Sequence, residues 1–401
     1  MHWCFAVAIL AVVSSARAWT LDEAVALART NHPALAAARQ RIAAADGRAQ
    51  QARLWPNPEL ELTATDVPAN DGGLARSQNM IGVSQTVPFP GKKALDGQIG
   101  RQEVRAAELA YLTRERDVVR AVQSAFWRAL AAQKKVDVAA ELVALNKSLV
   151  DVARQRIAAG ATGDQERLRA EIELERAGVE LSAAQRELAE ARLALAAAVG
   201  RPRDPLGPLA GELREQVPVA NHDPTLAQHP SRQLAGAEQQ RAELEARRAR
   251  LDPLPDVTFG VAGGRNNADR ETLVEFRVSL PLPLFDRAQG RQRETHALAA
   301  AARQDATATE QQLVSELDQI TARLRAAGEQ VETYRTRILP RAAEALKLVQ
   351  AGYAAGKFGF LDLVDTQRTA AETRLTYLDK LLELNLALAD REALAGTTPK
   401  E

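Results

Sequence analysis

Two carboxylates near the C-terminal end of the chain have the spacing of residues that share one helix face. Asp362 and Asp365 stand three residues apart in GFLDLVDTQR, so on a helix both side chains lie on one face. A solvated helix face is the usual reason for such a pair. The histidines offer no partner for metal binding, because they are isolated at His2, His32, His222, His229 and His296. No spacing resembles a zinc or copper site, so the sequence predicts no metal site and no cofactor.

Motifs for catalysis are missing as well. The sequence contains no phosphate loop, no Gly-rich nucleotide fingerprint and no serine nucleophile elbow. Lys plus Arg and Asp plus Glu both total 52, which gives no net field that would attract nucleic acid. We therefore expect a protein that is not an enzyme and does not bind nucleic acid.

The first eighteen residues are typical of an export signal. An apolar run from Phe5 to Val13 is followed by Ala16-Arg17-Ala18, a small-residue cleavage site that predicts a mature chain beginning at Trp19. The residues before the run carry no Lys or Arg, which departs from the usual signal, and an N-terminal helix is the structural alternative. Because the sole cysteine is Cys4, the mature chain would have no disulfides and no thiolate site.

The rest of the chain contains two halves with similar sequence landmarks. Asn31-His32-Pro33 recurs 197 residues later as Gln228-His229-Pro230, and ARLWPNPELEL (52–62) recurs at the same distance as ARLDPLPDVTF (249–259). Further landmarks follow in the same order with distances of 195 or 196: Pro88 and Pro283, Gly160 and Gly356, Gly163 and Gly359, Gly200 and Gly396. This register predicts an internal two-fold repeat, residues 19–215 and 216–401.

The sequence of each repeat predicts a helix, two short strands and a long helical hairpin. We expect strands at about 58–67 and 79–88 with a hairpin at about 94–200, then strands at about 255–262 and 272–283 with a hairpin at about 288–396. The chain contains only 4% aromatic residues, which favours thin, closely packed helices. Two heptad series on the helix from Asp164 to Val199 predict a coiled-coil stripe: Leu174, Leu181, Leu188 and Leu195, and Ala177, Ala184, Ala191 and Ala198.

The strand segments alternate between apolar and polar residues. Leu60 and Leu62 alternate with Glu59, Glu61 and Thr63, and the other three segments follow the same pattern. Each segment has about the length of a tilted β-strand that crosses an outer membrane. Half-buried hairpins on a soluble sheet are the alternative. The export signal and the aromatic residues at the strand ends, Trp55, Phe89 and Phe285, favour outer-membrane lipid as the surroundings.

Four strands cannot close a barrel. Three chains with about twelve strands would leave a lumen, so we expect a homotrimer in which strands lead into tunnel helices. Proline removes a ladder donor, and this predicts strand–helix elbows at Pro56, Pro58, Pro88, Pro90, Gly91, Pro281 and Pro283.

Three segments resemble the TolC-like outer-membrane efflux proteins, and within them the heavy-metal branch typified by CzcC. They are LWPNPELEL (54–62), SQTVPFPGKK (84–93) and VSLPLPLFDRAQG (278–290), where Ala288 stands at a position the branch often fills with Asn. The resemblance implies a mainly helical fold, with long coiled coils forming an α-barrel tunnel and four strands per chain in a trimeric 12-stranded barrel. It implies a passive exit duct in the outer membrane, extending into the periplasm, that works with a periplasmic adaptor and an inner-membrane proton-driven RND transporter.

The resemblance also assigns roles to the helical turns. It implies that the tips meet adaptor hairpins, with Arg154, Arg156 and Lys357 as contacts and Gly160, Gly163, Gly356 and Gly359 shaping the turns. Plain helix capping by glycine is the structural alternative. It further implies that Asp362 and Asp365 line the periplasmic entrance, where a trimer would carry acidic rings. The matching first-repeat positions are Glu166 and Arg169, so the acidic pair is not duplicated.

Two other functions stay open from the sequence. The same fold could conduct drugs or secreted proteins, because a tunnel wall need not recognise its cargo. A periplasmic structural or adaptor protein built on coiled-coil hairpins would use the same heptads without entering a membrane.

Overall fold

The computed structural model describes residues 18–69, 72–158, 160, 163–204, 206–218 and 226–395. The predicted signal peptide, residues 1–18, lies outside them except for Ala18. The chain divides into two compact units, one of Met1–Ala36, Arg114–Thr225 and Ser315–Glu401, the other of Ala37–Thr113 and Leu226–Val314. Each unit takes segments from both sequence repeats, so the compact units and the repeats divide the chain differently.

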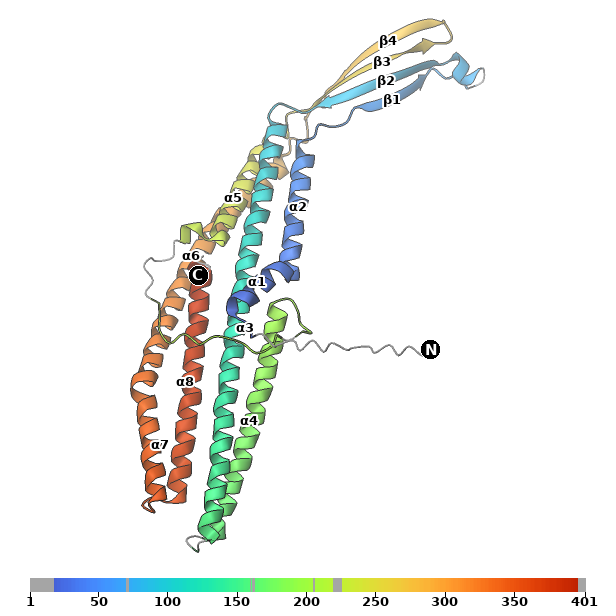
Figure 1. Ribbon diagram of the computed structural model, residues 1–401. Coiled ribbons are helices and arrows are strands. Elements are labelled where there is room, and N and C mark those ends of the chain that lie inside the picture. The colour runs from blue at the N-terminus through green and yellow to red at the C-terminus, as the bar shows by residue number, and fades with distance from the viewer. Residues whose placement is uncertain are drawn as a thin grey trace, which may run out of the picture. The chain divides into compact units, whose positions relative to one another are not determined.

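The second unit contains a four-stranded antiparallel sheet in the order β1-β2-β3-β4 (Figure 1). The strands are β1 (Glu59–Thr65), β2 (Gln78–Val87), β3 (Val257–Asn266) and β4 (Glu271–Ser279), and β2 pairs with β3 across the two repeats. The helix α5 (Pro230–Ala249) precedes β3, and α2 (Pro33–Arg53) precedes β1. Two short 3₁₀ turns, η1 (Gly73–Arg76) and η2 (Leu226–Gln228), complete the connections.

The second strand pair differs from its expected bounds. We expected β3 to end at 262, but it continues through Gly263 and Gly264 to Asn266. Gly264 permits a close approach to β2, because a Cβ on it would stand 2.1 Å from the carbonyl oxygen of Asn79. We expected the last strand to reach 283, but β4 ends at Ser279, before Pro281, which cannot donate to a ladder.

The sheet has one apolar face that no described residue of the chain covers. Phe276 is 81% exposed and Leu62 is 73% exposed, and the other apolar strand positions on this face are exposed as well: Leu60, Ile81, Val83, Phe259, Val261, Val274 and Val278. Such a contiguous apolar surface marks a membrane or protein contact. This exposure favours membrane strands over the alternative of half-buried hairpins on a soluble sheet.

Helices make up most of the described chain. Besides α2 and α5, they are α1 (Leu21–Asn31), α3 (Lys92–Ala158), α4 (Asp164–Ala198), α6 (Gln289–Thr333), α7 (Leu339–Ala354) and α8 (Phe360–Ala395). A π-turn, η3 (Tyr334–Ile338), separates α6 from α7, so the expected hairpin of the second repeat is interrupted. Pro340 near the start of α7 lacks the N–H needed for a regular helix, which accounts for the interruption. No helix in the described ranges is long and apolar enough to cross a bilayer.

The heptad stripe of α4 is its covered face. Ala177 and Leu195 are buried, and the remaining stripe residues are half-buried. The stripe prediction is therefore confirmed, and small residues on it allow close helix packing. Other apolar residues of α4 point away from it, since Leu168 is 49% and Val179 is 71% exposed.

Candidate functional site: helical tip and strand–helix elbow

The helical tip is the region where α3 turns into α4 and α7 turns into α8, all within one compact unit (Figure 1). Two of the four tip glycines have a left-handed backbone, Gly160 with φ 69° and Gly356 with φ 71°, a conformation that other residues adopt at a cost. Gly163 instead has an extended φ of −94° as the N-cap of α4.

A polar network joins α7 to the α3–α4 hairpin at the tip. The Tyr353 hydroxyl donates a hydrogen bond to Glu166, and the Arg156 guanidinium lies 3.4 Å from the same carboxylate. The guanidinium also stacks 4.7 Å from the centroid of the Tyr353 ring, a cation–π geometry. Burial, aided by the hydrogen bond to Glu166, raises the pKa of Tyr353, so its hydroxyl stays a neutral donor.

A small apolar cluster lies beside this network. Leu149, Tyr353 and Leu363 are buried together, and Phe360 packs edge-on against Tyr353 at 6.4 Å between ring centroids. Phe360 also contacts the cluster of Val150, Ala153 and Ala170. At the tip, the α7–α8 hairpin is thus held against the α3–α4 hairpin by this cluster and the polar network. Farther along the helices, the ion pairs of Lys135 with Asp379 and of Arg374 with Glu141 also connect α3 with α8.

The acidic pair Asp362 and Asp365 lies on the exposed first two turns of α8. Asp362 accepts a hydrogen bond of 2.9 Å from the backbone N–H of Gly359, which is a helix-capping contact. Asp365 lies 3.1 Å from the Arg368 guanidinium and remains 70% exposed. Both carboxylates therefore face solvent in the single chain.

The tip residues expected to contact a partner differ in how many contacts they already make within the chain. Lys357 is exposed in the turn, and Arg154 is 59% exposed although it approaches Asp151 and Glu171. Arg156 is held by Glu166 and Tyr353 within the chain. The sequence predicted no function for Glu166, although it is the repeat counterpart of Asp362. No motif or spacing in the sequence pointed to Tyr353.

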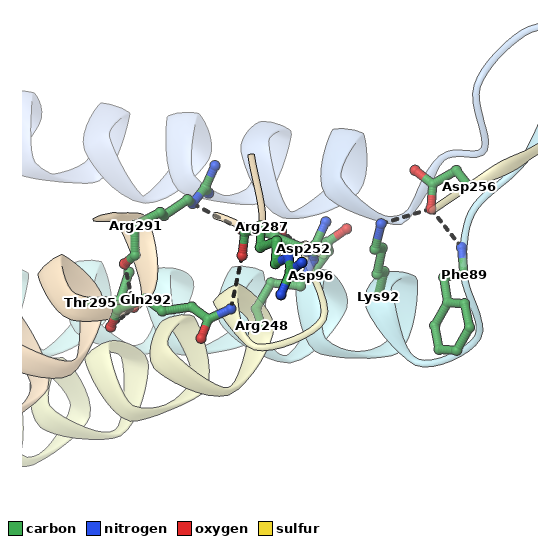
Figure 2. A network of polar contacts seen from close by, with 10 residues as sticks. All are labelled: Phe89, Lys92, Asp96, Arg248, Asp252, Asp256, Arg287, Arg291, Gln292 and Thr295. Atoms are coloured by element: carbon green, nitrogen blue, oxygen red, sulfur yellow. Dashed lines mark hydrogen bonds and ion pairs between the residues drawn. The ribbon is translucent and has the colours of Figure 1, made fainter. Parts of the chain in front are cut away.

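The strand–helix elbow is the region where β2 leads into α3 beside the start of β3, within the other unit. Lys92, only 8% exposed, forms an ion pair of 2.8 Å with Asp256 (Figure 2). The backbone N–H of Phe89 donates to the same carboxylate at 2.7 Å. Partial burial acts to raise the pKa of Asp256, but the hydrogen bonds from Lys92 and Phe89 outweigh it and leave the pKa lowered.

A second charged cluster continues the elbow along the helices. The Arg248 guanidinium lies 2.8 Å from Asp96 on α3 and 2.5 Å from Asp252. Arg291 on α6 reaches Asp252 at 3.2 Å (Figure 2). These contacts connect α3, α5 and α6 by charge-assisted hydrogen bonds, which are the stronger kind.

The predicted elbow residues lie in the connections between strands and helices. Pro56 and Pro58 stand between α2 and β1, Pro88 and Pro90 between β2 and α3, and Pro281 and Pro283 between β4 and α6. Gly91 has φ 93° at the last turn before α3, a backbone that glycine adopts without strain. The sequence did not reveal Lys92 and Asp256 as partners, because 164 residues separate them.

The histidines that mirror each other in the repeat act at helix starts. The Nδ1 atom of His229 accepts from the Ser231 N–H, and that of His32 accepts from the Ala34 N–H. The structural role that we expected for His229 is thereby confirmed. In the part of the chain that the structure describes, no three His, Cys, Asp or Glu side chains gather to hold a metal ion.

The model of the outer membrane efflux protein family matches residues 24–201 and 223–397. The chain belongs to this family. It is an efflux channel of the outer membrane, and family membership rules out the periplasmic adaptor alternative.

Individual relatives and solved structures agree with the family. The chain is 29% identical to the cobalt-zinc-cadmium resistance protein CzcC of Cupriavidus metallidurans over 94% of this chain and 90% of that protein. It is 28% identical to the nickel and cobalt resistance protein CnrC of the same organism over 66% of this chain and 63% of that protein. A crystal structure of the transmembrane channel CusC superposes with a TM-score of 0.79 at 18% identity, covering 94% of this chain and 91% of that chain. The fold is therefore TolC-like, as expected from the sequence.

Proposed function

We propose that the protein is a passive, homotrimeric exit duct for heavy-metal cations. The observation that carries this proposal is the 29% identity to a cobalt-zinc-cadmium resistance protein along 94% of the chain. The duct supplies no energy and performs no chemistry. A proton-driven RND transporter of the inner membrane and a periplasmic adaptor would supply the energy for transport and select the substrate.

The tip is the proposed docking region for the adaptor. A groove beside it is lined by Arg154, Leu168, Ile172 and Val179, together with Glu171, Glu175 and Glu180. Exposed apolar residues flanked by charges fit an amphipathic helix of a partner. Arg154 and Lys357 are the proposed charged contacts, with Gly160, Gly163, Gly356 and Gly359 shaping the turns, whereas Arg156 holds the tip together.

Asp362 and Asp365 are the proposed entrance ring. In a trimer each position would present three carboxylates, and rings of Asp attract cations in channels. The exposure of both carboxylates supports this role, and the helix-capping contact of Asp362 is compatible with it.

The proposal is tested by growth and cell-associated metal in a deletion strain, complemented or not, across Co, Zn, Cd, Ni, Cu and Ag, with dyes and antibiotics in parallel. We expect selective accumulation of one or a few metals that complementation reverses. Sensitivity to dyes and antibiotics with normal metal content would instead assign the duct to drug efflux.

A further inference from the structure

The polar face of the four-stranded sheet carries mostly negative charge. Its side chains alternate with the apolar positions along each strand, and four of them are carboxylates: Glu59, Glu61, Glu271 and Glu275. Arg277 is the only cation at the polar-face positions of β1, β2, β3 and β4, which all lie in the described part of the chain. In a membrane barrel the apolar face meets lipid, so the polar face lines the lumen.

The side chain of Arg277 crosses the sheet to reach one of its partners. One Nη atom lies 2.7 and 2.8 Å from the two carboxylate oxygens of Glu61, and the other lies 3.1 Å from Glu275. Glu275 is a neighbour on β4, but Glu61 is on β1, beyond β2 and β3. Because each strand spacing is about 4.8 Å, the side chains of Arg277 and Glu61 have to extend along the polar face to meet.

Small residues on the two inner strands leave this path open. The register places Gly82 and then Ala262 beside Glu61. Gly260 lies opposite Arg277, and a Cβ on Gly260 would stand 3.6 Å from the Cβ of Arg277. A long side chain at any of these three positions would lie between the guanidinium and Glu61. The inner strands therefore admit the bridge between Arg277 and Glu61.

The charge of Arg277 matters more than the stability of its bridge. The side chains of Arg277 and Glu61 are each 46% exposed, and ion pairs with this exposure contribute little to stability. The charges on a channel wall, by contrast, act on every ion in the lumen, because a lumen enclosed by protein concentrates their field. Arg277 offsets one of the wall carboxylates in each copy, while Glu59 and Glu271 remain exposed.

We propose that Arg277 sets the ion selectivity of the barrel part of the duct. It offsets part of the negative charge of the wall, and it does not narrow the lumen because its side chain lies along the wall. Charged side chains that line a channel select ions by their sign, so the remaining carboxylates favour small hydrated cations. This role rests on the proposed trimeric duct and adds a second charged region to the entrance ring of Asp362 and Asp365.

Two variants that break the same bridge separate charge from structure. Arg277→Gln removes a positive charge from the wall, and Glu61→Gln removes a negative one. In planar bilayers the ratio of K⁺ to Cl⁻ permeability should rise about twofold in Arg277→Gln and fall about twofold in Glu61→Gln, in about 0.1 M salt, where a charge acts over about 10 Å. A shift of both variants in the same direction would mark the bridge as structural and overturn the proposal.

Two further variants are matched controls. Arg277→Lys keeps the positive charge, and the double variant Glu61→Gln with Arg277→Gln keeps the net charge of the wall, so both should retain the wild-type permeability ratio. Passage of an uncharged sugar should be equal in all variants, because the lumen keeps its width. A permeability ratio in Arg277→Lys that matches Arg277→Gln, or faster sugar passage in Arg277→Gln, would overturn the proposal.

The barrel is separated from the entrance ring by repeating the recordings in Asp362→Asn with Asp365→Asn. The opposite shifts of Arg277→Gln and Glu61→Gln should persist in this background, and their absence would overturn the proposal. Opposite shifts in a protein whose deletion leaves the metal content of cells unchanged would support the role of Arg277 and remove the proposed heavy-metal cargo.

Discussion

The strand–helix elbow and the helical tip both join segments that are distant in sequence, but they do so by different means. At the elbow a nearly buried lysine is paired with Asp256, and arginines on two helices add further ion pairs. At the tip one tyrosine hydroxyl, one arginine and a small apolar cluster connect the two hairpins. The elbow therefore resists separation more strongly than the tip.

This difference matches the roles that we propose for the two regions. An elbow that holds the strands of a barrel in register benefits from contacts that are costly to break. Removing one partner of such an ion pair leaves the other charge poorly solvated and unpaired. An entrance that must open benefits from contacts of small free energy, because regions that move belong to the less stable parts of a structure. Substitutions at the elbow should change assembly, and substitutions at the tip should change conduction.

The largest effect is expected from Lys92→Met. The substitution leaves the Asp256 carboxylate without its cation and should destabilise the fold by about 2 kcal/mol. The dissociation temperature of the trimer in detergent measures this loss. Lys147→Met, at an exposed position of the same helix, is the matched control, and equal behaviour of the two variants would contradict the role of the elbow pair.

A smaller effect is expected from Gly356→Ala. The alanine would have to adopt the left-handed backbone at φ 71°, at a cost of about 1–2 kcal/mol. Efflux should fall while trimers stay intact. Gly163→Ala is the control, because its φ is −94° and the space around it is open; a similar loss in both would show that the turn backbone is not the cause.

A still smaller effect on stability is expected from Tyr353→Phe. It removes the hydrogen bond to Glu166, whose net contribution is about 0.5–1.5 kcal/mol, and keeps the packing against Phe360. Arg156 still pairs with the Glu166 carboxylate. Single-channel conductance should rise while the dissociation temperature of the trimer hardly changes. Tyr334→Phe on the π-turn is the control, and an unchanged conductance in Tyr353→Phe would contradict a restraint at the tip.

The smallest effects are expected from pH. The lowered pKa of Asp256 means that its stabilisation is present above its ordinary pKa of 3.8 and is lost as the pH falls through the folded value. The raised pKa of Tyr353 means that its stabilisation is present below pH 10.0 and is lost as the pH rises through the folded value. The wild-type trimer should dissociate at a lower temperature in acid than at neutral pH. This difference should be smaller in Lys92→Met, in which the Phe89 N–H still bonds to Asp256.

The sequence was most informative where single residues restrict the backbone. Pro88 located the end of β2, although the last strand ends at Ser279 and not at the predicted 283. Heptad leucines and alanines located the covered face of α4. Gly263 and Gly264 were assigned to a loop, but both lie within β3, where Gly264 lets β2 approach closely. The contact of Tyr353 with Glu166 could not be predicted, since the two residues are 187 positions apart and meet only when their hairpins pack together.

Planar-bilayer recording of the purified protein is the most direct test of a trimeric duct with an acidic entrance. Wild type should form channels that favour cations, and Asp362→Asn with Asp365→Asn should conduct more and lose that preference, while Glu372→Gln further along α8 should behave as wild type. Unchanged conductance and selectivity in the double variant would contradict the proposed entrance ring, and the absence of channels from folded trimers would contradict the duct itself.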